Sequence, residues 1–135
     1  FMSNAMTGKP ITVYGDGRQT RDYLYISDAV DAFVRAAILK EANNEVFMVG
    51  SGVETVFIDM VNEVVSATGK GEVTHVEFPG NRQQIDIKRF VADIRKAEEL
   101  LGWTPTTDLM SGVRQTCDFY QKDGILEKYI HRCSS

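Results

Sequence analysis

Residues 14–28 of the chain read YGDGRQTRDYLYISD, and this stretch decides the predicted fold. It starts at the end of a short β-prone run, Ile11–Tyr14, and its Gly-Asp-Gly segment is a turn signal. A second β-prone run, Asp22–Ile26, follows, and either Ser27 or Asp28 can cap a helix after it. We therefore expect a strand, a tight turn, a second strand and a helix in succession, which is typical of α/β or α+β domains.

The segments that follow continue this mixture of short strands and amphipathic helices. The helix after residue 28 carries Val30, Phe33, Val34, Ala37 and Ile38 at the spacing of one buried face. Further strands or extended pieces are predicted over Glu45–Val49, Val73–Phe78 and Lys88–Ala92. Further helices are predicted after caps at Thr55, Asp93 and Asp108, with Gly69 ending the first and Gly102 the second, and over Gly124–Ile130.

Length and composition limit the function classes. The 135 residues are the size of one domain, and 43% hydrophobic residues can form a packed core. A net charge of -4 argues against a sequence-independent nucleic-acid binder, which needs a dense basic face. The sequence has no apolar run long enough to span a membrane. Two distant cysteines, Cys117 and Cys133, do not form a disulfide framework, so we expect a reduced, cytoplasmic protein.

The first residues, Phe1–Gly8, have the pattern of the last turns of a helix with glycine after its end. We therefore expect the chain to be a piece of a longer protein. The alternative is that residues 3–5 are a scar of tag removal and that Met6 is the native start, but Phe1-Met2 does not fit such a scar.

Three motifs, taken in order, resemble one family. They are residues 14–28, the FMVGSGVET of residues 47–55, and the ADIRKA of residues 92–97 followed by LLGWTP at 100–105. This series resembles the C-terminal half of the extended short-chain dehydrogenases/reductases that act on nucleotide-diphosphate sugars, such as the UDP-glucose 4-epimerases and the sugar-nucleotide 4,6-dehydratases. The resemblance implies an α/β fold: the C-terminal, substrate-binding part of an NAD(P)-binding Rossmann-type epimerase/dehydratase, without its N-terminal dinucleotide-binding half.

Two features of the family's N-terminal half are missing from the sequence. Gly15 and Gly17 lack the third glycine of a dinucleotide fingerprint, and the pattern predicts no helix directly after them. No tyrosine has a lysine four residues later, so the family's Tyr-x-x-x-Lys catalytic pair is absent. We therefore name no catalytic residue, and we expect NAD to serve the complete family enzyme but not to bind this chain alone.

The resemblance selects Arg21 as the first candidate for binding substrate. In the family, the arginine of the Arg-Asp-Tyr motif contacts the diphosphate, and a guanidinium offers planar paired donors to phosphate oxygens. From spacing alone, a surface ion pair of Arg21 with Asp22 or Asp16 is the alternative. Arg82 is a candidate second phosphate clamp, although many family members carry the arginine at the position of Gln83; an exposed loop arginine is the alternative.

Three further residues complete the predicted substrate site. Asp86 matches the acidic position that faces the nucleotide ribose in epimerases, with a solvated cap as the alternative. Thr12 and Tyr14 lie on the strand that runs beside the nucleotide base in the family. Tyr14 can stack on a base, but it can equally be half-buried packing. His75 and His131 lie far apart, and neither a metal cluster nor a nucleophile pattern is supported.

The sequence thus predicts, over residues 1–135, the substrate-binding half of an NAD-dependent nucleotide-sugar epimerase or dehydratase, with a nucleotide-diphosphate sugar as its ligand. A stand-alone, non-catalytic nucleotide-sugar binding module and an assembly fragment without a ligand are the alternatives. We also expect the chain to self-associate or to bind a missing N-terminal half, because the apolar Val46–Val49 segment needs to be covered.

Overall fold

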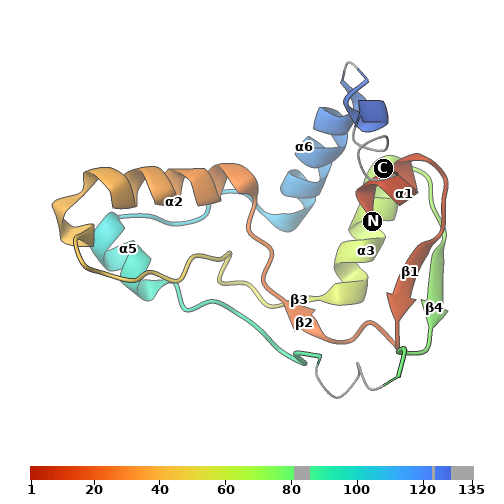
Figure 1. Cartoon of the computed structure of the whole chain (residues 1–135), viewed down its shortest axis with the longest axis horizontal. Coiled ribbons are helices and arrows are strands. Elements are labelled where there is room, and N and C mark those ends of the chain that lie inside the picture. The colour runs from red at the N-terminus through yellow and green to blue at the C-terminus, as the bar shows by residue number, and fades with distance from the viewer. Residues whose placement is uncertain (81–85, 123, 129–135) are drawn as a thin grey trace. The chain divides into compact units, whose positions relative to one another are not determined.

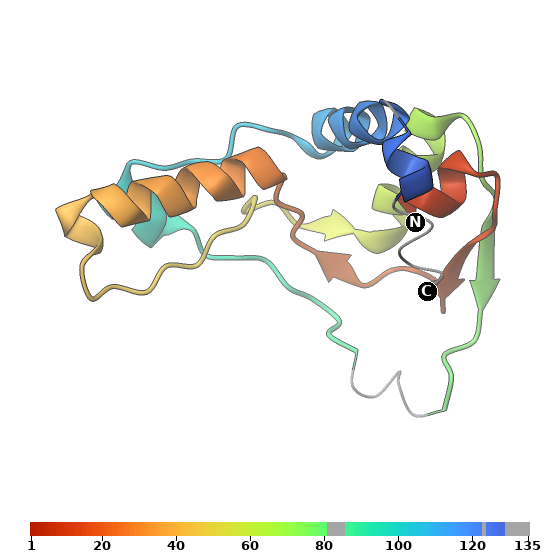
Figure 2. The same ribbon diagram turned by 45° about the horizontal axis from the view of Figure 1, so that its top comes forward.

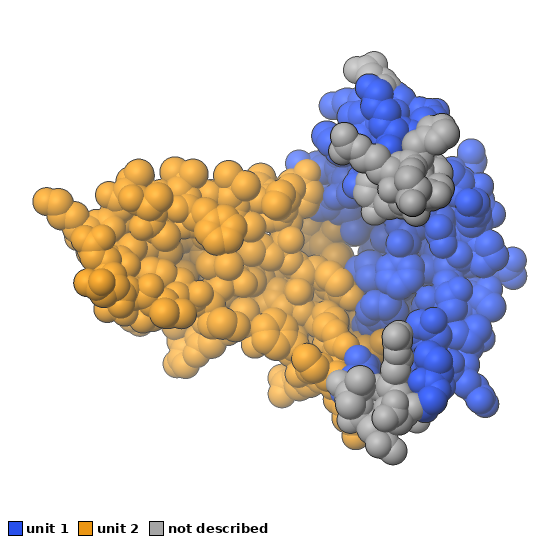
Figure 3. All heavy atoms as spheres, viewed as in Figure 1, with its two compact units in different colours: residues 1–18, 57–86, 110–135 blue, residues 19–56, 87–109 orange. Residues whose placement is uncertain are grey.

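A computed structural model describes residues 1–80, 86–122 and 124–128, and the chain divides into two compact units (Figure 3). Unit 1 comprises residues 1–18, 57–86 and 110–135, and unit 2 comprises residues 19–56 and 87–109. The prediction of one substrate-binding region over residues 1–135 stays a prediction.

Unit 1 is built on a pair of parallel strands, β1 (Ile11–Tyr14) and β4 (Val73–Val76), which lie side by side in Figures 1 and 2. Its helices are α1 (Met2–Met6), α3 (Phe57–Thr68) and α6 (Leu109–Gln121). The first residue of α6, Leu109, still belongs to unit 2, because the last segment of unit 1 begins at residue 110. The predicted strands at 11–14 and within 73–78, and the predicted helix end before Gly8, are confirmed.

The core of unit 1 follows from the alternation of residues along β1. Ile11 and Val13 are fully buried, while Thr12 and Tyr14 are exposed. The predicted turn after β1 is confirmed, because Gly15 and Gly17 have φ values of 67° and 70°. A Cβ on Gly15 would lie 2.7 Å from the ring of Phe78. Glycine is therefore required there both by the positive φ value and by this close contact.

Unit 2 contains the short antiparallel pair β2 (Thr20–Arg21) and β3 (Thr55–Val56), with α2 (Ile26–Ile38), a 3₁₀ turn η1 (Lys40–Ala42) and α5 (Arg95–Leu101). Its buried core consists of Ala32, Ala97, Leu101 and Trp103. The indole Nε1 of the fully buried Trp103 donates to the carbonyl of Asp28 at 2.9 Å. Gly102, at φ 58°, ends α5 as predicted.

Several predicted caps and strand ends are wrong. No strand lies over the predicted Asp22–Ile26, because β2 covers only the two residues before it, Thr20–Arg21. Thr55 lies in β3 and does not cap α3. Helix α2 begins at Ile26 without a side-chain cap. Asp28 lies inside its first turn, 6% exposed, and accepts hydrogen bonds from Thr106 Oγ1 at 2.9 Å and from the Thr107 amide at 3.0 Å. Asp28 thus accepts hydrogen bonds from residues far away in the sequence and does not cap its own helix, as the sequence had suggested.

The predicted buried face of α2 is also wrong. Val30, Phe33 and Ile38 are 51%, 67% and 72% exposed. The opposite face packs into the core through the small residue Ala32, which is 2% exposed. Helix α5 lies beside α2 and contacts it, as Figures 1 and 2 show. An amphipathic pattern predicts which residues share a face, but it does not say which face meets the core.

The apolar segment Glu45–Val49 was predicted as a strand, but the structure assigns no strand to it. Phe47 and Val49 pack against the core of unit 2, whereas Val46 is 82% exposed. Within the described residues, no helix has the length and the apolar character needed to cross a membrane.

Candidate substrate-binding site

Arg21 lies on β2 in unit 2 and is partly buried. Its Nη1 donates to the carbonyl of Thr20 at 2.8 Å and to the carbonyl of Ile87. These carbonyls fix the direction of the guanidinium, because a planar fork with several donors is oriented by any two of its bonds. Of its predicted alternative partners, Asp16 forms a surface ion pair with Arg18 at 3.8 Å, and Asp22 serves the turn described next.

Asp22 anchors the loop segments around Arg21. Its carboxylate accepts hydrogen bonds from the amide and hydroxyl of Ser51 at 2.5 and 2.6 Å, and from the amides of Gly52 and Ala92, each at 3.0 Å. Burial by itself raises the pKa of Asp22, but the hydrogen bonds from Ser51, Ala92 and Gly52 outweigh burial and leave the pKa below its usual value. A Cβ on Gly50 would lie 2.5 Å from Asp22 Oδ2, so this close approach needs glycine.

Tyr23 is a candidate site residue that the sequence reasoning did not select. Its hydroxyl is buried, and among the described residues it is the buried side-chain polar atom without a hydrogen-bond partner. Burial raises the pKa of Tyr23, and the positive charge of Arg21 opposes that rise. A buried hydroxyl that lacks a partner is costly, so it marks a place where another molecule can supply one. The position of Tyr23, two residues after Arg21 in a β-prone run, was the available signal.

A cavity of about 290 Å³ lies against Tyr23. Its lining is rich in hydroxyl groups and consists of Tyr23, Ser51, Val53, Thr55 and residues 105–109, all of them in unit 2. The cavity therefore offers polar contacts from two loops. One contains Ser51, which donates to Asp22, and the other contains Thr106, which donates to Asp28.

Hydrogen bonds of the Glu54 carboxylate connect β2 and the 88–90 segment to the residue before β3. Glu54 accepts a hydrogen bond from Thr20 Oγ1 at 2.9 Å and a bidentate pair from Arg89 at 2.8 and 2.9 Å. The bonds from Arg89 and Thr20 lower the pKa of Glu54, and Glu54 raises the pKa of Arg89. The amide of Thr20 donates to the carbonyl of Lys88 at 3.0 Å, and the amide of Phe90 donates to the carbonyl of Thr20 at 3.3 Å.

The other predicted site residues lie in unit 1 or outside the described part of the chain. Thr12 and Tyr14 lie exposed on β1, and Tyr14 packs against Phe78 with ring centroids 5.9 Å apart while 42% of it stays exposed. Asp86 is the last described residue of unit 1 before unit 2 resumes. Arg82 lies outside the described residues.

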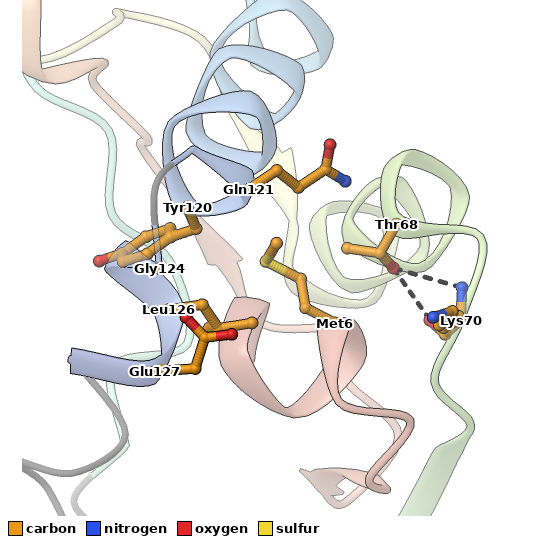
Figure 4. A pocket seen from close by; sticks show the side chains of 8 residues that line it. All are labelled: Met6, Thr68, Lys70, Tyr120, Gln121, Gly124, Leu126 and Glu127. Carbon is orange, nitrogen blue, oxygen red and sulfur yellow. Dashed lines mark hydrogen bonds between the residues drawn. The ribbon is translucent and has the colours of Figure 1, made fainter.

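A second pocket, of about 240 Å³, lies in unit 1 (Figure 4). Met6 comes from α1, Thr68 is the last residue of α3 and Lys70 follows that helix, and Tyr120 and Gln121 come from α6. Gly124, Leu126 and Glu127 complete the lining. The hydroxyl of Thr68 donates to the carbonyl of Lys70 at 2.9 Å. No predicted site residue lines either pocket, and we place the candidate site at the cavity beside Tyr23 because Tyr23 lies two residues after Arg21 in the same unit.

The glycine turns at Gly15–Gly17 and at Gly50–Gly52 do not fit a dinucleotide. A phosphate cradle needs free backbone amides at the start of a helix. The turn at Gly15 and Gly17 leads into β2, not into a helix. At Gly50–Gly52, the carboxylate of Asp22 already occupies the amides of Ser51 and Gly52. We therefore derive no cofactor chemistry from the described residues.

Metal and thiol chemistry likewise find no support in the part of the chain that the structure describes. It holds no group of three His, Cys, Asp or Glu residues able to bind a metal ion. Cys117 is buried on α6 with a pKa raised by burial, which is the environment of a packed thiol and not of a reactive one.

Comparison with known proteins identifies the family. A family model described as GDP-mannose 4,6 dehydratase matches residues 1–116. UDP-glucose 4-epimerase of Mycolicibacterium smegmatis is 33% identical over 121 residues, which are 90% of this chain and 37% of that protein. The chain thus spans less than two fifths of this relative's length.

Solved structures agree with this result. The UDP-glucose 4-epimerase of Thermotoga maritima, solved with UDP-glucose, superposes with a TM-score of 0.79 at 29% identity, covering 90% of this chain and 38% of that one. The UDP-glucuronic acid 4-epimerase of Bacillus cereus, solved with UDP-glucuronic acid and NAD, has a TM-score of 0.76 at 28% identity, covering 95% and 38%. The chain therefore belongs to the family of NAD-dependent nucleotide-sugar epimerases and dehydratases and corresponds to a part of its Rossmann-like fold.

Proposed function

We propose that this chain is the substrate-binding part of an NAD-dependent nucleotide-sugar epimerase or dehydratase and that it holds the nucleotide diphosphate at Arg21. The observation that carries the proposal is the oriented guanidinium of Arg21 two residues before Tyr23, which lines a hydroxyl-rich cavity and has a buried hydroxyl without a partner. A diphosphate needs fixed positive charge together with neutral donors, and these two residues supply both.

Arg21, Asp22 and Tyr23 have different roles in the proposed binding. Arg21 donates to phosphate oxygens, and Tyr23 donates from its hydroxyl to a phosphate or sugar oxygen. Asp22 contacts no ligand and positions both neighbours by fixing the 50–52 turn and Ala92. Binding energy gathered at the nucleotide, away from the reacting carbon, helps to position that carbon for reaction. The other predicted contacts stay proposals from the family resemblance alone: Arg82 for the phosphates, Asp86 for the ribose, and Thr12 and Tyr14 for the base.

In the complete family enzyme, NAD would supply reversible hydride transfer from and to the sugar carbon that bears the hydroxyl group. We propose that cofactor binding and proton transfer belong to parts of the fold other than the described residues, because the glycine turns at 15–17 and 50–52 do not fit a dinucleotide. The same observation favours a second candidate, a non-catalytic nucleotide-sugar binding module. A reduced, cytoplasmic location and an isomerase activity remain parts of this proposal.

Calorimetric titration with UDP and UDP-glucose tests the proposal. Arg21→Gln removes the charge but keeps a side-chain donor for the carbonyls of Thr20 and Ile87. We expect affinity to fall at least about tenfold, because one charge-assisted phosphate contact contributes about 1.5–3 kcal/mol. Arg18→Gln is the matched control, since Arg18 is three residues away and its side chain is 85% exposed.

The outcomes distinguish two claims: that the chain binds UDP, and that Arg21 is part of the binding site. Wild-type binding that Arg21→Gln weakens and Arg18→Gln leaves intact supports the site. Equal affinity of all three proteins removes Arg21 from the site, and absence of UDP binding to the wild-type chain contradicts the proposed function. Tyr23→Phe should keep the melting temperature while weakening the affinity by a smaller factor than Arg21→Gln does.

A further inference from the structure

The lining of the cavity beside Tyr23 contains two groups of residues with different hydrogen-bonding character. Tyr23 and Thr55 carry hydroxyls that can donate, and Thr55 pairs with Arg21 between β2 and β3. The second group is a continuous stretch of the chain, here called the 105–109 wall, and consists of Pro105, Thr106, Thr107, Asp108 and Leu109. The chemistry of this wall limits the part of a nucleotide sugar that it can bind.

The buried carboxylate of Asp28 engages the donors of this wall. Thr106 Oγ1 donates to Asp28 Oδ1 at 2.9 Å, and the amide of Thr107 donates to Oδ2 at 3.0 Å. Because Asp28 is only 6% exposed, a hydroxyl that turned away from it would leave a buried carboxylate oxygen short of a donor. Burial by itself raises the pKa of Asp28, but the hydrogen bonds from the side chains and amides of Thr106 and Thr107 outweigh burial and leave the pKa below its usual value. The donors of both threonines therefore serve Asp28 and not a ligand.

The groups that remain on the wall accept hydrogen bonds. A threonine hydroxyl that donates to a carboxylate keeps lone pairs for a further donor. The carboxylate of Asp108 only accepts, and Pro105 has no N–H. Leu109 begins α6, and a helix start attracts anions, but Asp108 places a negative charge directly before it. The 105–109 wall thus favours a ligand that donates hydrogen bonds and disfavours a phosphate group.

Within a nucleotide-diphosphate sugar, the terminal sugar fits this wall best. It carries more hydroxyl donors than the ribose does, and the phosphates carry acceptors. The cavity, of about 290 Å³, is near the lower limit of about 300 Å³ for small-molecule sites. It can therefore enclose one terminal ring, whereas the ribose is held between the diphosphate and the base. Val53, Pro105 and Leu109 supply apolar surface for the C–H groups of the ring.

We propose that the 105–109 wall binds the hydroxyl groups of the sugar, with Thr106 Oγ1 and the Asp108 carboxylate as acceptors, while Arg21 holds the diphosphate. This inference rests on the proposed function and adds the part of the substrate that the cavity selects. Asp28 contacts no ligand and acts as a positioning residue, because it fixes the direction of the Thr106 hydroxyl. Thr106 then determines specificity, since it requires a sugar hydroxyl that donates.

Calorimetric titration with UDP and with UDP-glucose measures what the sugar contributes. We expect the wild-type chain to bind UDP-glucose about tenfold more tightly than UDP, the effect of one or two hydrogen bonds. Thr106→Val keeps the shape of the side chain but removes the acceptor, so this ratio should fall about fivefold while the affinity for UDP is unchanged. Thr106→Ser restores the hydroxyl and should restore the ratio. Thr104→Val, at an exposed threonine outside the cavity lining, is the matched control and should change neither affinity.

UDP-glucose analogues with one hydroxyl replaced by fluorine test the same claim on the wild-type chain. Fluorine takes up nearly the space of a hydroxyl but cannot donate, so the analogue fluorinated at the position that faces Thr106 should bind about fivefold more weakly than UDP-glucose. In Thr106→Val, this analogue and UDP-glucose should bind equally, because the acceptor has already been removed. Such coupling identifies a direct contact, which a general loss of structure in the variant would not produce.

Three results would overturn the sugar assignment while leaving the proposed function intact. They are equal affinities of the wild-type chain for UDP and UDP-glucose, fluorinated analogues that all bind as tightly as UDP-glucose, and a loss of affinity for UDP itself in Thr106→Val, which would place the ribose at this wall. A wild-type chain that binds neither UDP nor UDP-glucose contradicts the proposed function and this inference with it. Circular dichroism checks that each variant keeps its helices.

Discussion

Two apolar segments of similar length, Ile11–Tyr14 and Glu45–Val49, have similar sequences but different structures. The first is β1, which pairs along its whole length with β4 and buries Ile11 and Val13 completely. The second is assigned to no strand and leaves Val46 82% exposed. Local β-propensity favours an extended backbone in both, but a ladder also requires a partner strand, and its presence depends on residues far away in the sequence.

Side chains, not a ladder, hold the second segment in place. Phe47 and Val49 pack against the core of unit 2. Lys96 binds Glu45 at 2.6 Å, and its Nζ lies 5.4 Å from the ring centroid of Phe47. Asp22 then fixes the turn that follows. This comparison shows that the same type of sequence can be stabilised by backbone pairing in one place and by a few side-chain contacts in another.

The largest expected effect comes from placing one charge in each segment. Val13→Asp buries an unpaired carboxylate in the core of unit 1 and should destabilise the fold by more than about 3 kcal/mol. Val46→Asp should change the free energy of unfolding by at most about 0.5 kcal/mol, since the side chain is already exposed. Urea unfolding of both variants measures the difference. Similar losses in the two variants would mean that residues 45–49 are covered in solution.

A smaller effect concerns the acid sensitivity of the turn after the second segment. The folded-state pKa of Asp22 is lowered, so its contribution to stability is complete above its unfolded pKa of about 3.9 and is lost as the pH falls through the folded value. Asp22→Asn removes this titration and should reduce the loss of stability between about pH 4 and pH 2, while Asp28 continues to titrate in the same direction. Urea unfolding over this pH range measures both slopes. Identical slopes in the variant and the wild type would show that Asp22 is not held by these hydrogen bonds.

Local signals predicted the fold where the structure depends on local chemistry. The glycines at 15, 17, 69 and 102 adopt the positive φ values that turns and helix ends require, and β1 alternates as its sequence does. The burial of Asp28 and the exposure of Phe33 could not be predicted, because both depend on which distant segment packs against α2.

The candidate site was predicted in part. Arg21 came from its motif, and the structure adds the carbonyls that orient it. Tyr23 was missed because a buried hydroxyl without a partner is visible only after the surrounding loops have been placed. Thr12 and Tyr14 remain candidates on β1, and the prediction for Arg82 lies outside the described residues.

The central claim is that Arg21 and the cavity beside Tyr23, both in unit 2, bind the nucleotide diphosphate. Titration of the ¹⁵N-labelled chain with UDP, followed by amide chemical shifts, tests it directly. The account predicts saturable shifts at Arg21, at Tyr23 and at the cavity-lining residues Ser51, Val53 and Thr55, with the pocket around Thr68 and Lys70 unaffected. Shifts confined to the Thr68 and Lys70 pocket, or no shift at millimolar UDP, would contradict it.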